Sequence, residues 1–371
     1  MRAPWLPLAL VLAAAASSPA QEQPRPQPAQ EKAPKRPDTE AGLRWLAGKQ
    51  GLDGSWGERD KLALTGMSGL ALLASGSTPQ RGPYSENIRR ALMFVLACQK
   101  ADGRAFQHPS SGYSAIHNHG YALLFVTQAY GEGGPLDEQL RYAIQQGIKA
   151  TVASQFTGPE ERRDGGFGYF LYRTKGQDKH PNMWKDDEAS TTISQVQALR
   201  GARNAGFAVP EKSIERAERY IANCAHKPTG GFVYSYGNYR VSFVEGSNRP
   251  TFAITAASTA VLHALGTYQG PLVEGGLRYM ESFIPPTKRK TPFYYYAHYY
   301  AAQVMHMAGG ARGKRWLNAI LEELAERQRS GGSWGADPED SLAQGDSEVL
   351  NTAWALQVAL IERSYLPLHE R

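Results

Sequence analysis

The chain has 371 residues, of which 41 are Lys or Arg and 35 are Asp or Glu, giving a formal net charge of +6. This basic excess is small and scattered, so the composition does not indicate a nucleic-acid-binding protein. The sequence has only two cysteines, Cys98 and Cys224, which excludes a disulfide framework and leaves the hydrophobic core to stabilise the fold.

The N-terminal region predicts export. A basic start, an apolar stretch over 5–16 and the small residues before Gln21 are typical of a secretory signal peptide over residues 1–20. That stretch is too short for a comfortable transmembrane span, so none is expected. Residues 21–38 are rich in Pro, Gln, Glu and Lys and predict a flexible linker. We therefore expect a periplasmic or secreted protein whose folded part is residues 39–371.

Two kinds of helical segment alternate from residue 39 onward. The first is amphipathic, as in 313–328, where Trp316, Ile320 and Leu324 recur on one face. The second is apolar around most of its circumference, as in 347–362, and belongs inside. The amphipathic segments are 39–50, 84–99, 137–155, 210–224, 271–284 and 313–328. The apolar segments are 61–75, 114–130, 188–205, 250–265, 292–308 and 347–362. Sustained period-two alternation is missing from the sequence, which predicts an all-α fold of six helix hairpins.

One short motif occurs near both ends of the chain. It reads Gln-x3-Gly-Ser-Trp, from Gln50 to Trp56 and again from Gln328 to Trp334, each time between the two helices of a hairpin. Glycine permits the tight turn there, and the aromatic side chain can fill the junction. An open repeat array usually has atypical terminal caps, so similar first and last repeats favour a closed ring.

These motifs resemble a known family. Gln-x3-Gly-Ser-Trp looks like the repeat motif of squalene and oxidosqualene cyclases, and Ser347–Leu356 is similar to the inner helix that follows it there. The Gly-Gly-Phe loops ending at Phe167 and Phe232, and the aromatic run 293–300, look like the repeats of protein prenyltransferase β subunits. The resemblance covers about 39–363 and implies an α6/α6 toroid, a barrel of six helix hairpins.

The resemblance also implies a structural role for the repeat motif. In the family the Gln joins the end of an outer helix to the following helix, and the Trp stacks beneath the loop. By this likeness Gln50, Trp56, Gln328 and Trp334 are structural residues.

The catalytic acid of the cyclases has a partial match. Those enzymes protonate their substrate with an Asp in an Asp-x-Asp-Asp-Thr motif, and the nearest segment here runs from Trp184 to Glu188. Trp184 replaces the first Asp and Glu188 the Thr, while Asp186 occupies the position of the acid and Asp187 follows it. Adjacent like charges raise the pKa of such an acid, as proton donation requires. Alternatively, these acids cap the helix that begins near Glu188 and complement its dipole.

A metal or cofactor is not expected. The zinc ligands of prenyltransferase β subunits include an Asp-x-Cys pair, but the segment 231–250 contains neither Asp nor Cys. His298 could replace the His ligand, yet a lone His does not hold zinc.

Aromatic residues concentrate where the loops enter the inner helices, so we expect them at one mouth of the barrel. The candidate binding residues are His119, Tyr169, Tyr236, Tyr296 and His298. Such a mouth suits an isoprenoid, lipid, glycan or peptide ligand. We interpret the protein as a non-catalytic ligand-binding or scaffold module. One alternative is a terpenoid cyclase or isoprenoid transferase with Asp186 as proton donor; another is a carbohydrate-active toroid that uses paired carboxylates.

Overall fold

A computed structural model describes residues 35–100, 105–158, 163–171, 188–236, 249–283, 291–335, 347–363 and 365–369. These belong to one compact unit that begins at Pro34. The predicted signal peptide and residues 21–34 of the predicted linker lie outside the described residues.

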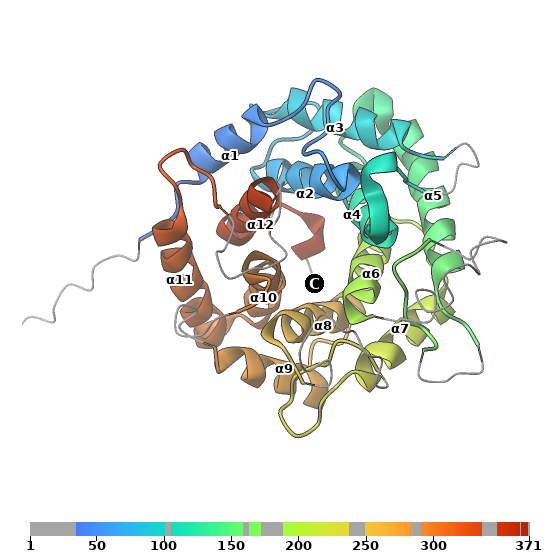
Figure 1. The fold of residues 1–371 in the computed structure, drawn as a ribbon, viewed down its shortest axis with the longest axis vertical. Coiled ribbons are helices and arrows are strands. Elements are labelled where there is room, and N and C mark those ends of the chain that lie inside the picture. The colour runs from blue at the N-terminus through green and yellow to red at the C-terminus, as the bar shows by residue number, and fades with distance from the viewer. Residues whose placement is uncertain are drawn as a thin grey trace, which may run out of the picture. The chain divides into compact units, whose positions relative to one another are not determined.

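Twelve α-helices occur in these ranges and form two concentric rings (Figure 1). The outer ring consists of α1 (Thr39–Gly48), α3 (Ser85–Ala97), α5 (Asp137–Ser154), α7 (Glu211–Asn223), α9 (Pro271–Glu281) and α11 (Gly310–Arg327). The inner ring consists of α2 (Lys61–Ala74), α4 (Ala115–Ala129), α6 (Ala189–Asn204), α8 (Phe252–Ala264), α10 (Tyr294–Ala308) and α12 (Ser347–Leu360). Each inner helix contacts the next, and α12 contacts α2, so the ring is closed. The predicted all-α toroid of six helix hairpins is confirmed.

The burial of the two helix classes follows their sequence patterns. In α2 every residue from Leu62 to Ala74 is buried, as expected for a helix enclosed on all sides. In α7 burial is confined to one face, represented by Ile214, Ala217 and Ile221. Among the described residues, β-pairing is limited to three isolated bridges.

Glutamine side chains connect neighbouring outer helices. The Gln50 amide donates to the carbonyl oxygens of Gly54, 2.8 Å away, and of Asn87 on α3, 2.9 Å away. Gln328 donates to the Asp38 carbonyl at 2.8 Å and accepts from the Asp38 N–H at 2.7 Å. Because Asp38 is the N-cap of α1, this pair of bonds joins the last repeat to the first.

The two motif tryptophans are fully buried and bond to the preceding outer helix. Trp56 Nε1 donates to the carbonyl of Leu46, and Trp334 Nε1 donates to that of Leu324, each at 2.8 Å. Each indole therefore fixes its loop against the end of a helix while filling the space between the rings.

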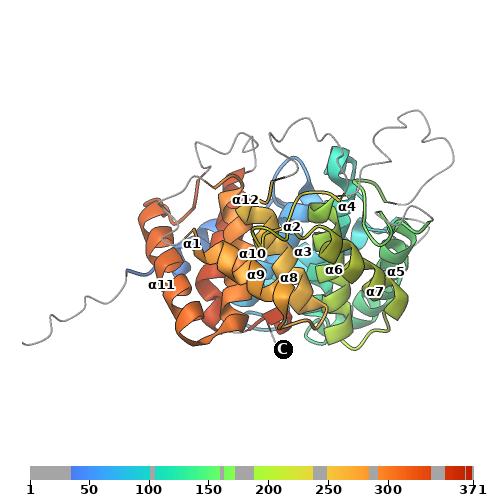
Figure 2. The same ribbon diagram turned by 90° about the horizontal axis from the view of Figure 1, so that it is seen from below.

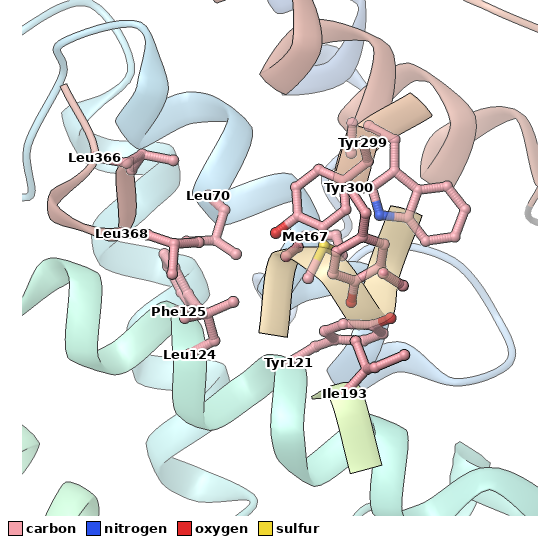
Figure 3. Close-up of a cluster of buried hydrophobic side chains, with 14 of the residues drawn as sticks. Met67, Leu70, Tyr121, Leu124, Phe125, Ile193, Tyr299, Tyr300, Leu366 and Leu368 are labelled. Atoms are coloured by element: carbon pink, nitrogen blue, oxygen red, sulfur yellow. The ribbon is translucent and has the colours of Figure 1, made fainter. Parts of the chain in front are cut away.

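The C-terminal turn η6 (Pro367–His369) covers one end of the barrel. Leu368 N–H donates to the side chain of Gln128 near the end of α4, and the Pro367 carbonyl accepts from Asn204 at the end of α6. Leu366 and Leu368 are buried, and Figure 3 shows them beside Leu70, Leu124 and Phe125. In the side view of Figure 2 this end of the barrel is the lower one. The turn is therefore packed into this end of the barrel.

None of the helices in the described ranges combines the length and hydropathy needed to cross a bilayer.

Candidate functional site

A cavity of about 520 Å³ opens at the end of the barrel opposite η6. Every inner helix contributes residues near its N-terminus. Its walls include Ala63, His117, Tyr121, Ser190, Phe252, Ile254, Tyr296, Leu350 and Trp354 from these helices, and Tyr169, Tyr234, Tyr279 and Phe283 from elsewhere. The volume is typical of sites for small organic ligands, and most of this lining is aromatic or aliphatic.

One wall of the cavity carries a cluster of polar groups, here called the Glu188 cluster: Tyr169, Glu188, Ser190 and Tyr234. The Tyr169 and Tyr234 hydroxyls lie 3.1 Å apart, and the Ser190 hydroxyl lies 3.3 Å from that of Tyr234. Ser190 also donates to Glu188 Oε2 at 3.3 Å. Only 2 % of Glu188 is exposed, whereas the other three residues reach the cavity. The fold thus places a buried carboxylate behind three hydroxyls on a mainly apolar surface.

Burial raises the pKa of the Tyr169 and Tyr234 phenols, and the neighbouring charge of Glu188 raises both further. Both phenols are therefore protonated at neutral pH. Burial also lowers the pKa of His117 to about 4, which a hydrogen bond to the Ser190 backbone partly opposes. His117, whose ring packs against Tyr169 with centroids 5.9 Å apart, is accordingly neutral.

The rest of the cavity wall is mainly aromatic. Tyr296 packs edge-on against Trp354 with ring centroids 5.7 Å apart, and Phe252 packs against Phe283 at 4.9 Å. Such surfaces suit apolar and unsaturated ligands.

A second carboxylate, that of Asp60, reaches the cavity at the start of α2. It accepts a hydrogen bond from the Asn118 amide at 2.6 Å, while the Asn118 carbonyl oxygen accepts from Ala63 N–H at 3.0 Å. This acid is therefore engaged in joining α2 to α4. Within the described ranges no three His, Cys, Asp or Glu side chains come together as a metal site.

Only some of the candidate binding residues line the cavity. Tyr169 and Tyr296 line the cavity. His119 does not, because it lies between α4 and α5, where its ring nitrogens contact the Phe106 N–H at 3.3 Å and the Thr151 hydroxyl at 3.0 Å. Residues two apart in a helix point about 200° from each other, so only His117 faces the cavity.

The same geometry places His298, two residues after Tyr296, away from the cavity. Its ring is buried behind the cavity wall, next to Phe252 and Trp316. Tyr236 is 36 % exposed and does not line the cavity.

Asp186 and Asp187 lie outside the described residues. The sequence did not single out Glu188 or Ser190 as site residues, although Glu188 follows this acidic pair directly and Ser190 lies two residues further on. Trp354 was also missed; its signal was its place about two turns into the apolar segment 347–362.

No protein-family model and no curated protein sequence matches the chain. Solved structures do resemble it. The type II terpene cyclase MstE from Scytonema, in a variant bound to geranylgeranyl dihydroxybenzoate, superposes with a TM-score of 0.58 at 14% identity, covering 88% of this chain and 97% of that one. The α-1,6-mannanase GH76A of Salegentibacter sp. HEL1_6, in an inactive variant bound to α-1,6-mannotriose, superposes with a TM-score of 0.61 at 9% identity, covering 87% and 98%.

The chain has a terpene-cyclase-like α/α-toroid fold. At these identities the likeness concerns the fold alone. Because the two similar toroids bind an isoprenoid compound and an oligosaccharide, respectively, the toroid does not determine the ligand. The chemistry of the cavity must decide between these ligand classes.

Proposed function

We propose that the protein binds an apolar, isoprenoid-type molecule in the cavity at the barrel mouth. The observation that carries this proposal is the aromatic and aliphatic lining contributed by all six inner helices. Burying apolar surface contributes about 25 cal/mol per Å² removed from water, so a hydrocarbon chain gains from most of this wall.

A sugar fits the same lining poorly. Each ring presents several hydroxyl groups, and burying one without a partner costs roughly 1–3 kcal/mol. Aromatic and aliphatic residues make up most of the described wall, and its polar side chains, which are few, include those of Tyr169, Ser190, Tyr234, Asp60, His117, Asn118 and Arg249. An oligosaccharide would therefore leave most of its hydroxyls against aromatic rings.

A second candidate function is acid-initiated cyclisation or isomerisation of the bound isoprenoid. The observation that favours it is that the acidic run containing Asp186 and Asp187 continues into Glu188, which lies behind the cavity wall. Incubation with acyclic C15 and C20 isoprenoids, followed by gas chromatography with mass detection, tests for conversion. Unchanged isoprenoids that nevertheless bind would support a binding protein without chemistry.

Binding can be measured directly, because Trp354 lines the cavity and should report occupancy by its fluorescence. Farnesene and squalene represent apolar isoprenoids, and α-1,6-mannotriose represents the glycan class. We expect saturable binding of an isoprenoid and none of mannotriose. The reverse result would refute the proposal.

A matched pair of variants locates the binding site on α8. Ala253 lines the cavity near the start of this helix, while Ala264 lies at its last position. Ala253→Leu should occupy part of the cavity and weaken isoprenoid binding at least tenfold, whereas Ala264→Leu should leave it unchanged. Circular dichroism would verify that both variants are folded.

The proposed ligand binding is extracytoplasmic if the signal peptide predicted at 1–20 is functional. N-terminal sequencing of the protein from the cell envelope or medium tests this, with Gln21 expected as the first residue.

A further inference from the structure

The Glu188 cluster makes one wall of the cavity chemically different from the others. We propose that this cluster accepts a hydrogen bond from a hydroxyl group of the ligand, so that the natural ligand is a neutral isoprenoid alcohol or phenol. This inference rests on the proposed function and specifies the polar group that the apolar molecule carries.

The argument begins with the hydrogens available in the cluster. Tyr169, Ser190 and Tyr234 each carry one hydroxyl hydrogen, and an ionised carboxylate such as that of Glu188 only accepts. The distances of 3.1 and 3.3 Å between these groups let each hydrogen point at a neighbouring oxygen inside the cluster. Hydroxyl oxygens have two lone pairs and only one hydrogen, so what remains toward the cavity is acceptor capacity.

His117 adds to this acceptor character. Its ring interacts with the Ser190 backbone and is neutral, so one nitrogen carries the hydrogen and the other is an acceptor. The side chain lines the cavity beside Tyr169.

A carbonyl group is the wrong partner for such a wall. It has no hydrogen to donate, and its oxygen would face the lone pairs of Tyr234 and Ser190. A hydroxyl group donates to one of these oxygens and leaves the internal bonds of the cluster intact. One such bond, made away from water, is worth about tenfold in affinity.

A cationic amine also donates hydrogen bonds, but the surroundings disfavour it. Arg249 lines the cavity, and all six inner helices direct their N-termini, which carry partial positive charge, toward it. The Asp60 carboxylate at the start of α2 provides some opposing charge while it bonds to Asn118. The negative charges of Asp60 and of the buried Glu188 are thus opposed by Arg249 and the helix N-termini, and this balance favours a neutral donor.

Four C15 probes with the same chain separate these cases: farnesol, farnesal, farnesylamine and farnesene. Calorimetry or Trp fluorescence gives the dissociation constant of each. We expect farnesol to bind about tenfold more tightly than farnesal and farnesene, and more tightly than farnesylamine. Equal affinities for farnesol and farnesal would overturn the inference, as would tightest binding of the amine.

Two variants assign the preference to the cluster. Tyr234→Phe removes one acceptor oxygen and should reduce farnesol affinity to that of farnesal without changing farnesal binding. Glu188→Gln replaces an acceptor by an amide that donates, so it should raise farnesal affinity and reduce or reverse the preference. Tyr220→Phe, at a buried tyrosine of α7 outside the cavity, is the matched control and should leave the ratio unchanged.

The outcomes also separate this inference from the proposed function. If all probes bind but the alcohol is not preferred, or if Tyr234→Phe leaves the preference intact, the cavity takes isoprenoids and the hydroxyl assignment is wrong. If none of the four probes binds, the proposed function fails first. Should Glu188→Gln not fold, Tyr234→Phe alone decides the assignment.

Discussion

Replacing Gln328 and Gln155 separately by Ala tests how the ring is held together. Gln328 makes two hydrogen bonds to the Asp38 backbone and one to Gly332, but Asp38 is exposed. Gln155 is 6 % exposed, and its amide donates to the carbonyls of Gly165 at 3.0 Å and Ser213 at 2.9 Å.

The magnitudes follow from what each substitution leaves behind. After Gln328→Ala, water can solvate the Asp38 groups, so the loss should be about 1–2 kcal/mol even though three bonds disappear. After Gln155→Ala, two buried carbonyl groups lose a partner, and each costs roughly 1–3 kcal/mol, so the total should reach about 2–6 kcal/mol. The burial of the groups left without a partner, and not the number of hydrogen bonds lost, should therefore determine which variant loses more stability.

Urea unfolding followed by circular dichroism measures both free energies. Gln145→Ala, at an exposed position of α5, is the control and should change stability by less than about 0.5 kcal/mol. The reasoning is refuted if Gln328→Ala costs as much as Gln155→Ala, because ring closure would then depend on Gln328 beyond its hydrogen bonds.

Three further predictions concern buried groups. The Tyr296 hydroxyl is buried without a partner among the described residues. Tyr296→Phe should therefore raise the free energy of unfolding by up to about 1 kcal/mol in urea titrations. A loss of stability in this variant would contradict the prediction. Burial lowers the pKa of His117 and His119 to about 4 and of His298 to about 3. Below pH 6.5 the unfolded state therefore binds more protons than the folded state, so the free energy of unfolding should fall from pH 6.5 toward pH 4. The fall should be smaller in His298→Leu. Equal pH slopes in the wild type and this variant would argue against His298 as a source of the pH dependence. Leu368→Ala should lower the free energy of unfolding by about 2–4 kcal/mol, because η6 packs its buried leucines into the end of the barrel. Thermal or urea unfolding measures this, and a loss below about 0.5 kcal/mol would show that the turn is not anchored.

Most of the fold could be predicted from sequence because its signals are local. Apolar periodicity distinguishes inner from outer helices, and glycines such as Gly76, Gly206 and Gly266 adopt positive φ just after inner helices. The predicted segment 188–205 corresponds to α6 at 189–204, and 137–155 to α5 at 137–154. Ring closure also had a local signal, since both copies of the motif occur at hairpin junctions.

The site could be predicted only in part, because it depends on helix rotation. Sequence placed an aromatic mouth at the start of the inner helices, and Tyr169 and Tyr296 do line the cavity. It named His119, whereas His117 lines the cavity, because α4 is apolar around nearly its whole circumference and its pattern does not mark one cavity face. Such a choice needs the packed neighbours, here Phe106 and Thr151, which bond to His119.

Glu188 shows that an acidic residue at the start of a helix need not be a helix cap. The helix-capping interpretation of the acidic run predicts that an acid there bonds to amides of α6. Glu188 is the N-cap residue of α6, but its side chain makes no capping hydrogen bond. Its carboxylate instead lies with the hydroxyls of Ser190, Tyr169 and Tyr234, and the two tyrosines come from loops outside α6. One loop belongs to the same hairpin as Glu188 and the other to the next hairpin, so the polar wall of the cavity forms only when two neighbouring repeats pack together.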